Sequence, residues 1–279
     1  MTFRFALVLL MIIEMLHSAP NADAQVAKAL GGTAATSDDL AKATQNPVAD
    51  LVSVPLQFNW YSGGDIPDGR TLSVLNLQPV FPLPINDKWT LIARTIVPIM
   101  NVPLANDERS TGIGDIQGQF FFAPVKSSGV IWGLGPVLSF PTATNEAVNT
   151  GQFAAGPTAV VLAMPGSWVI GTLANSMWRI GGSDTGPAIH STLVQPFINL
   201  NFKRGWSLSY SPVITANWNA ASGDEWTVPV GLGVSKVAAV GTRPVSLSLQ
   251  YYRNAVRPPG AGEHQVRMVV SLLYPKAKS

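Results

Sequence analysis

The clearest pattern in the chain is an alternation of apolar and polar positions over residues 206–218. Every second residue from Trp206 to Trp218 is apolar or aromatic, and most residues between them are serine, threonine or asparagine. Because successive side chains of a strand point to opposite faces, the pattern predicts a strand with one apolar face. Its length is about 43 Å, or about 30 Å at a 45° tilt, which is the hydrocarbon thickness of a bilayer. Tryptophan at both ends is typical of the two membrane–water interfaces.

Similar alternation recurs along the rest of the chain and predicts about twelve strands. They are expected at residues 52–61, 71–81, 89–100, 114–123, 130–140, 152–164, 168–180, 190–202, 206–218, 226–235, 245–252 and 264–274. Longer polar connections such as 101–111, 141–150 and 253–263 alternate with shorter turns such as 237–242. This rhythm favours an all-β fold, a transmembrane up-and-down antiparallel β-barrel with long loops outside and short turns in the periplasm. The alternative is a large soluble β-sandwich, which would need more charge on its exposed faces.

Composition supports the membrane interpretation. Only 12% of the 279 residues are charged, against about 25% in soluble domains. No stretch of about 18 apolar residues follows the N-terminus, so helical membrane spans are not expected. The chain has no cysteine, which excludes disulfides and thiolate metal sites. A formal net charge of +2 is too small to indicate a nucleic-acid partner.

The first residues have the features of a secretory signal peptide. Arg4 precedes a short apolar run over residues 5–16, which only Glu14 interrupts. The sequence Ala-Asp-Ala at residues 22–24 is a cleavage site of the A-x-A type. We therefore predict a cleaved signal peptide at residues 1–24 and localisation in the outer membrane of a Gram-negative envelope; an uncleaved anchor helix is the alternative.

Residues 25–51 differ from the repeated strands. Ser37, followed by two aspartates, predicts the start of a short helix, and Asn46-Pro47 predicts its end. This segment could lie in the periplasm, enter the barrel as a plug, or be a loosely ordered leader. The barrel itself is predicted over residues 52–274, with a C-terminal tail at 275–279.

Several stretches resemble the phenol-degradation MetA-pathway family of bacterial envelope proteins, which are often labelled "neuromedin U". They are residues 45–57, 78–96, 112–115, 140–144, 195–199 and 226–233. The resemblance covers essentially the whole mature chain and implies an outer-membrane barrel that handles hydrophobic or aromatic compounds. The C-terminus departs from the usual barrel ending, because Tyr274, the last aromatic residue, is followed by five more residues.

The sequence offers little support for enzymatic chemistry. It contains no phosphate-binding loop and no histidine pair with metal spacing, so we expect no cofactor and no metal. Outer-membrane phospholipases use a histidine and a serine two residues apart on a strand, and here His190 and Thr192 share a face. Ser191 would point to the opposite face, and no asparagine can be placed to orient the histidine. Lipid hydrolysis therefore stays a remote alternative.

The polar faces of the strands supply the candidate site. The residues expected to line the lumen and the path of a substrate are Arg94, Asp115, Gln117, Gln119, Asn175, Arg179, Gln195, Asn199 and Arg267. Three arginines against one aspartate would make the lumen positive and favour anions or the carboxylate ends of small molecules. The alternative is that these side chains hydrogen-bond one another and fill a small barrel.

The combined expectation is an outer-membrane channel or transporter for small, hydrophobic or aromatic molecules. Its partners would be outer-membrane lipid and a small-molecule solute. The alternative is a closed structural or adhesion barrel that acts through its outer loops, such as 101–111 or 253–263.

Overall fold

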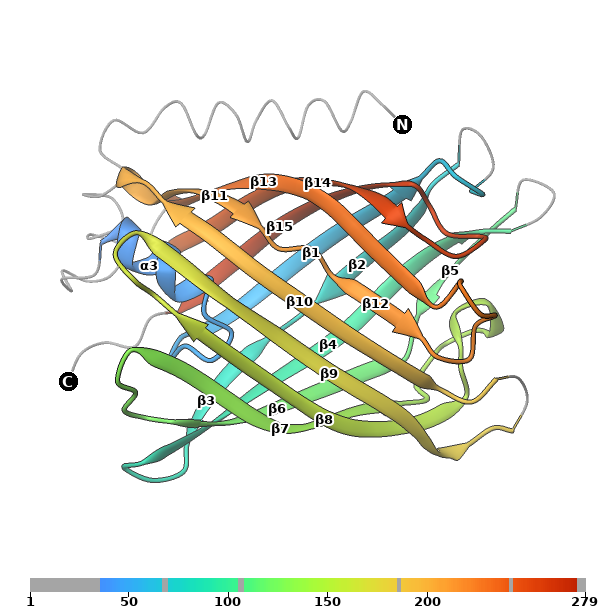
Figure 1. Cartoon of the computed structure of the whole chain (residues 1–279), viewed down its shortest axis with the longest axis horizontal. Coiled ribbons are helices and arrows are strands. Elements are labelled where there is room, and N and C mark those ends of the chain that lie inside the picture. The colour runs from blue at the N-terminus through green and yellow to red at the C-terminus, as the bar shows by residue number, and fades with distance from the viewer. Residues whose placement is uncertain (1–35, 67–69, 105–107, 185–186, 241–242, 275–279) are drawn as a thin grey trace.

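Fifteen strand segments form one antiparallel sheet that closes into a barrel (Figure 1). The computed structural model describes residues 36–66, 70–104, 108–184, 187–240 and 243–274. The predicted signal peptide and C-terminal tail lie outside the described residues. The strands are β1 Val52–Ser62, β2 Leu72–Leu77, β3 Val80–Pro84, β4 Trp89–Pro103, β5 Arg109–Ile113, β6 Ile116–Pro124, β7 Val130–Phe140, β8 Gln152–Ala163, β9 Trp168–Gly182, β10 His190–Asn201, β11 Trp206–Tyr210, β12 Ile214–Asn217, β13 Trp226–Val240, β14 Arg243–Val256 and β15 His264–Tyr274.

The described segments make twelve wall strands, because β2 and β3, β5 and β6, and β11 and β12 continue each other. Both members of each pair bond to the same neighbour: β2 and β3 to one edge of β4, β5 and β6 to its other edge, and β11 and β12 to β10. The ladder closes where β9 pairs with β10. The predicted all-β antiparallel barrel of about twelve strands is therefore confirmed.

The strand predicted over residues 206–218 is interrupted in its middle. Pro212 has no N–H to donate to a ladder, and β11 ends two residues before it. The backbone of Ser211 instead bonds to side chains inside the barrel: its N–H donates to Tyr252 Oη over 3.2 Å, and its carbonyl accepts from Arg267 Nη1 over 3.0 Å. Pairing with β13 stops at Ser209 and resumes at Thr215. The chain is thus held away from β13 over five residues.

Other boundaries also differ from the prediction. The predicted loop at 101–111 is mostly strand, because β4 runs on to Pro103 and pairs with β5. The predicted turn at 237–242 is also mostly strand, since β13 extends to Val240 and β14 begins at Arg243. Cross-strand pairing therefore continues past the points where the alternation of polarity becomes weak.

The two ends of the barrel differ. Connections 85–88, 125–129, 164–167 and 202–205 are short and lie at one end, called here the turn end. Longer connections such as 141–151, 218–225 and 257–263 lie at the opposite, loop end. The helix α3, Ser37–Thr44, sits at the turn end, where the start of β1 pairs with the end of β15 (Figure 1). The predicted alternation of long and short connections is present.

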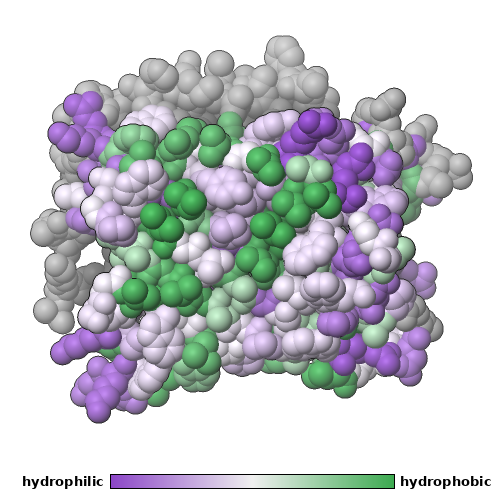
Figure 2. Space-filling model, viewed as in Figure 1, coloured by the Kyte–Doolittle hydropathy of each residue, from purple (hydrophilic) through white to green (hydrophobic). Residues whose placement is uncertain are grey.

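Burial is reversed relative to a soluble protein. Leu232 on the outer face is 55% exposed, whereas Ser207 and Asn199, which point inward, are 2% and 4% exposed. Figure 2 shows apolar patches across the middle of the visible face and most strongly hydrophilic residues toward the two ends. No helix within the described residues is long and apolar enough to cross a membrane. Most of the exposed large apolar side chains lie on the strands.

Aromatic side chains mark both ends of the apolar band. At the loop end, the rings of Trp218 and Trp226 have centroids 5.4 Å apart, and His190 lies 5.8 Å from Trp178. At the turn end, Trp89 and other outward tryptophans are partly exposed. Aromatic girdles at both edges of an apolar band are the surface pattern of membrane barrels.

Candidate functional site

The lumen contains two cavities that meet at four shared residues. The turn-end cavity has a volume of about 220 Å³ and the loop-end cavity about 230 Å³. Both are lined by Gln78, Arg94, Leu173 and Gln195, which we call the waist. Arg94, Leu173 and Gln195 lie near the middle of β4, β9 and β10, so the waist lies between the two halves of the lumen.

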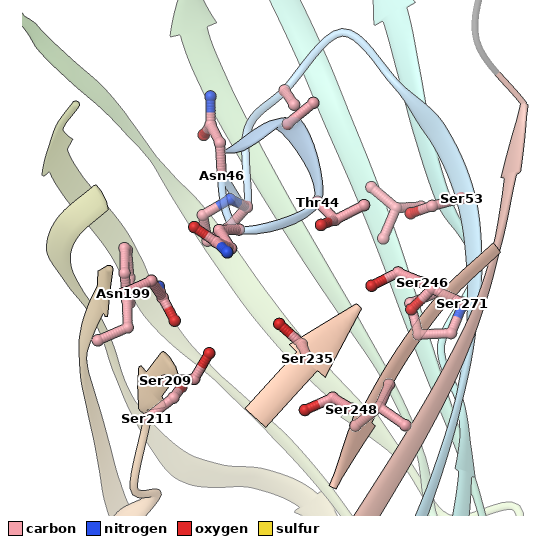
Figure 3. Close-up of a pocket in the computed structure, with 18 of the residues that line it drawn as sticks. Thr44, Asn46, Ser53, Asn199, Ser209, Ser211, Ser235, Ser246, Ser248 and Ser271 are labelled. Atoms are coloured by element: carbon pink, nitrogen blue, oxygen red, sulfur yellow. The ribbon is translucent and has the colours of Figure 1, made fainter. Parts of the chain in front are cut away.

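One side of the turn-end cavity is a wall of serines. Its seven serines come from strands β1, β13, β14 and β15 and from the interrupted strand around β11 (Figure 3): Ser53, Ser209, Ser211, Ser235, Ser246, Ser248 and Ser271. Each faces inward because it occupies the polar phase of its strand. Small hydroxyl side chains leave space open and offer both donors and acceptors. The predicted site residues omitted this wall, although the alternating serines are visible in the sequence.

The opposite side of the lumen is apolar. A buried cluster joins strands β4, β6, β8, β9 and β10 with the segment before β1: Val48, Ile92, Phe121, Ala123, Val160, Leu162, Val169, Leu173 and Phe197. Leu173 and Phe197 also line the turn-end cavity. The turn-end cavity therefore presents hydroxyl groups on one side and the apolar side chains of Leu173 and Phe197 on the other, which suits a solute with a polar group and an apolar body.

The segment before β1 covers the turn end of the lumen. The predicted helix is confirmed as α3, which begins with a capping box in which Thr36 Oγ1 accepts from Asp39 N over 3.1 Å. Leu40 and Ala41 pack in a second buried cluster with Leu51, Val237 and Leu273. Such caps and apolar contacts fix where a helix starts and which face it buries.

Polar contacts hold the same segment over the cavity. Gln45 donates to Asn201 Oδ1 over 2.9 Å, and Asn201 donates back to Gln45 Oε1 over 3.0 Å. Asp38 Oδ1 accepts from Gly205 N over 2.6 Å. Gly205 has a φ of +71°, and a Cβ there would lie 3.1 Å from Ser37 Cβ, so glycine permits this close approach. Residues 43–47 consequently line the turn-end cavity.

Arg94 is the predicted arginine that faces both cavities. It lies on β4, opposite Val80 of β3 and Gln119 of β6, and it donates to Gln78 Oε1. Its side chain is half-buried, and no carboxylate in the described part of the chain forms a salt bridge with it. Its positive charge therefore faces the open lumen.

The other two predicted arginines are engaged elsewhere. Arg267 is 3% exposed and donates to Asn59, Gln250 and the carbonyl of Ser211 at 3.0–3.2 Å. Arg179 forms a salt bridge with Asp184 at the loop end. Arg267 supports the interrupted wall strand, and Arg179 supports a loop-end connection. The charge of Arg94 alone among these three is directed at the cavities.

The polar residues of the candidate site also divide by position. Gln117 and Gln119 line the loop-end cavity, Asn199 lines the turn-end cavity, and Gln195 lines both. Gln195 also donates to Ser211 Oγ over 2.9 Å. Asn175 is buried beside Thr158 and Leu193 in the wall and is outside both linings.

Asp115 lines the loop-end cavity and also organises the connection at 141–151. Its carboxylate accepts from Ala143 N over 3.2 Å, from Thr150 N over 3.1 Å and from Thr150 Oγ1. Backbone N–H groups that donate to a carboxylate fix the path of a loop. Asp115 therefore has a structural role besides its position in the lumen.

Replacing Asp115 by alanine should loosen this connection. Hydrogen bonds to a charged group contribute about 1.5–3 kcal/mol, so we expect cleavage after Glu146 by endoproteinase Glu-C to become at least about tenfold faster. Digestion of the folded protein in detergent, followed by mass spectrometry, measures the rate. Asp224→Ala, in a different loop-end connection, is the control and should leave this cleavage unchanged. Equal rates in the two variants would contradict the role given to Asp115.

The pair considered for lipid hydrolysis is arranged differently from a nucleophile and its base. Thr192 Oγ1 accepts from Trp218 Nε1 over 2.8 Å and lies 2.7 Å from Ser176 Oγ. The ring of His190 packs between Trp178 and Trp218 in the loop-end girdle. Within the described residues, no group of three or more histidine, aspartate or glutamate side chains could hold a metal ion.

Solved structures provide the comparison for this architecture. An outer membrane channel from Pseudomonas putida F1 has a TM-score of 0.59 at 14% identity, over 80% of this chain and 94% of that one. The NanC porin has a TM-score of 0.52 at 8% identity, over 80% and 100%. This is the fold of a Gram-negative outer-membrane barrel.

Outer membrane phospholipase A from Escherichia coli has a TM-score of 0.46 at 14% identity, over 85% of this chain and 99% of that one. A likeness of that size carries no inference about activity. No protein-family model and no curated protein matches the sequence. The resemblance to the MetA-pathway family therefore stays a prediction.

Proposed function

We propose that the chain is an outer-membrane channel for small molecules that combine a polar group with a hydrophobic or aromatic body. The observation that carries the proposal is the pair of cavities that meet at the waist inside a barrel with an apolar outer band. A lumen with a serine wall and an apolar side offers both kinds of contact to one solute. Outer-membrane lipid would cover the outward leucines, valines and tryptophans.

The proposal gives the two ends different roles. The turn end would face the periplasm, and the described residues 36–51 would narrow it, because part of this segment lines the turn-end cavity. The loop end would face the outside of the cell. The predicted signal peptide and membership of the MetA-pathway family belong to the same proposal, and the resemblance supports the hydrophobic or aromatic character of the solute.

The test is electrical. Purified protein in a planar lipid bilayer should give discrete current steps in potassium chloride. Ser248→Phe should reduce the step size by at least about half, because a side chain with several times the volume would enter the turn-end cavity. Leu249→Phe is the matched control, since Leu249 is the next residue along β14 and points outward. A silent bilayer, or equal steps in the two variants, would contradict the proposed path.

A further inference from the structure

The charge distribution around the two cavities is unusually simple. Within the described residues, the cavity linings contain formal charges at two positions, Arg94 and Asp115. Asp115 lies at the loop end, and its carboxylate already accepts hydrogen bonds from Ala143 and Thr150. Arg94 lies at the waist, and its contact with Gln78 engages one of the five N–H donors of a guanidinium. The remaining donors are available to a molecule in the lumen.

A second polar group lies beside Arg94. Gln119 faces Arg94 directly across the β4–β6 ladder, so their Cβ atoms lie about 5 Å apart on the lumenal face. Gln119 also lines the loop-end cavity, so its terminal amide can supply a further donor to a molecule held by Arg94.

The surroundings define which molecule fits these donors. Leu173 is at the waist, and Phe197 lies beside it on the apolar side of the turn-end cavity. A guanidinium binds a carboxylate through two parallel hydrogen bonds, and an apolar side accepts the rest of the molecule. A cavity of about 220 Å³ accommodates one small organic molecule with a single ring.

We propose that the waist binds small organic acids, with the carboxylate on Arg94 and Gln119 and the apolar body against Leu173 and Phe197. This inference rests on the proposed function for the route by which the acid arrives, but the binding itself does not require conduction. Arg94 is thereby a selectivity residue, and the serine wall supplies contacts that do not discriminate between charges.

Binding is tested with benzoate as the anionic probe and benzamide as its neutral isostere. Isothermal titration of the full mature protein in detergent should detect benzoate. Arg94→Gln should weaken benzoate binding by at least about tenfold and leave benzamide unchanged. Arg94→Lys keeps the charge but loses the two-pronged geometry, and should weaken benzoate only a few-fold. Arg179→Gln, a loop-end arginine already paired with Asp184, is the control and should bind benzoate normally.

The outcomes separate the two proposals. Arg94-dependent benzoate binding without current steps would contradict the channel proposal and support the binding site. Current steps with no benzoate binding, or with equal binding in the parent and Arg94→Gln, would overturn this site and keep the channel. An equal loss in Arg179→Gln would also overturn it. If Arg94→Gln does not fold, Arg94→Lys decides, because unchanged benzoate affinity in that variant contradicts the two-pronged contact.

Discussion

Deletion of residues 37–47 should raise the single-channel conductance several-fold. These residues form α3 and the turn after it, and they include five of the seven residues of the segment that line the turn-end cavity. Conductance through a pore is limited by its narrowest part, so removing a covering segment widens the path more than any single substitution can. Planar bilayer recordings on the deleted and parental proteins provide the measurement.

A full-length variant shows whether a rise in conductance comes from loss of the covering segment or from damage to the barrel. Leu40→Asp combined with Ala41→Asp places two carboxylates in the buried cluster that docks the helix. Burying unpaired charge costs more than leaving it in water, so this variant should also open the turn end. Lys42→Ala removes only a contact with Gly166 O and should conduct like the parent. A folded deletion variant with parental conductance would show that the segment does not close the path.

Replacing Arg267 by methionine should lower the free energy of unfolding by about 3 kcal/mol or more. The change leaves Ser211 O without its donor and removes one donor each from Asn59 and Gln250. It also removes the contact of the guanidinium with the Tyr252 ring, 5.1 Å away. Because Ser211 lies where the wall strand leaves the ladder, the loss falls on an already weakened part of the barrel.

Thermal unfolding in detergent, followed by the mobility of the folded band on gels, measures this effect. Arg253→Met is the matched control, because Arg253 is 68% exposed and pairs with Glu263 in a loop-end connection. Exposed ion pairs contribute about 0–1 kcal/mol, so this variant should unfold near the parental temperature. Similar unfolding temperatures for both variants would contradict the role of Arg267 as a support for residues 211–213.

Much of the fold could be predicted because alternation of polarity is a local property. Trp206, Leu208 and Ser207 take the faces that their positions predict, and the same holds along the other strands. The break at Pro212 could not be read from this pattern. Ser209 pairs with Gly233 and Thr215 with Thr227, so the register is the same on both sides of the break. The alternation therefore continues across residues that have left the ladder.

The candidate site was predicted less completely, because the fate of a polar residue depends on distant strands. Arg94, Arg179 and Arg267 all occupy polar positions, and the sequence gives them one role. Their partners come from different parts of the barrel. Arg179 pairs with Asp184 and Arg267 bonds to groups of the wall, whereas Arg94 faces the cavities. The helix was predicted from its local capping signal, whereas its docking depends on Gly205, which lies 167 residues from Asp38. Contacts of that kind are absent from any local pattern.

The serine wall has a consequence for how fast a solute could move. Neighbouring inward positions of a strand are about 6.6 Å apart, so a molecule can engage the next hydroxyl before it fully leaves the last. We expect the free energy along such a track to vary little, because each hydroxyl replaces its predecessor with an equivalent partner. Ser246 and Ser248 are such neighbouring positions on β14, and Ser271 and Ser235 lie beside them on the adjacent strands. Selection between solutes would take place at one position along the lumen, at Arg94.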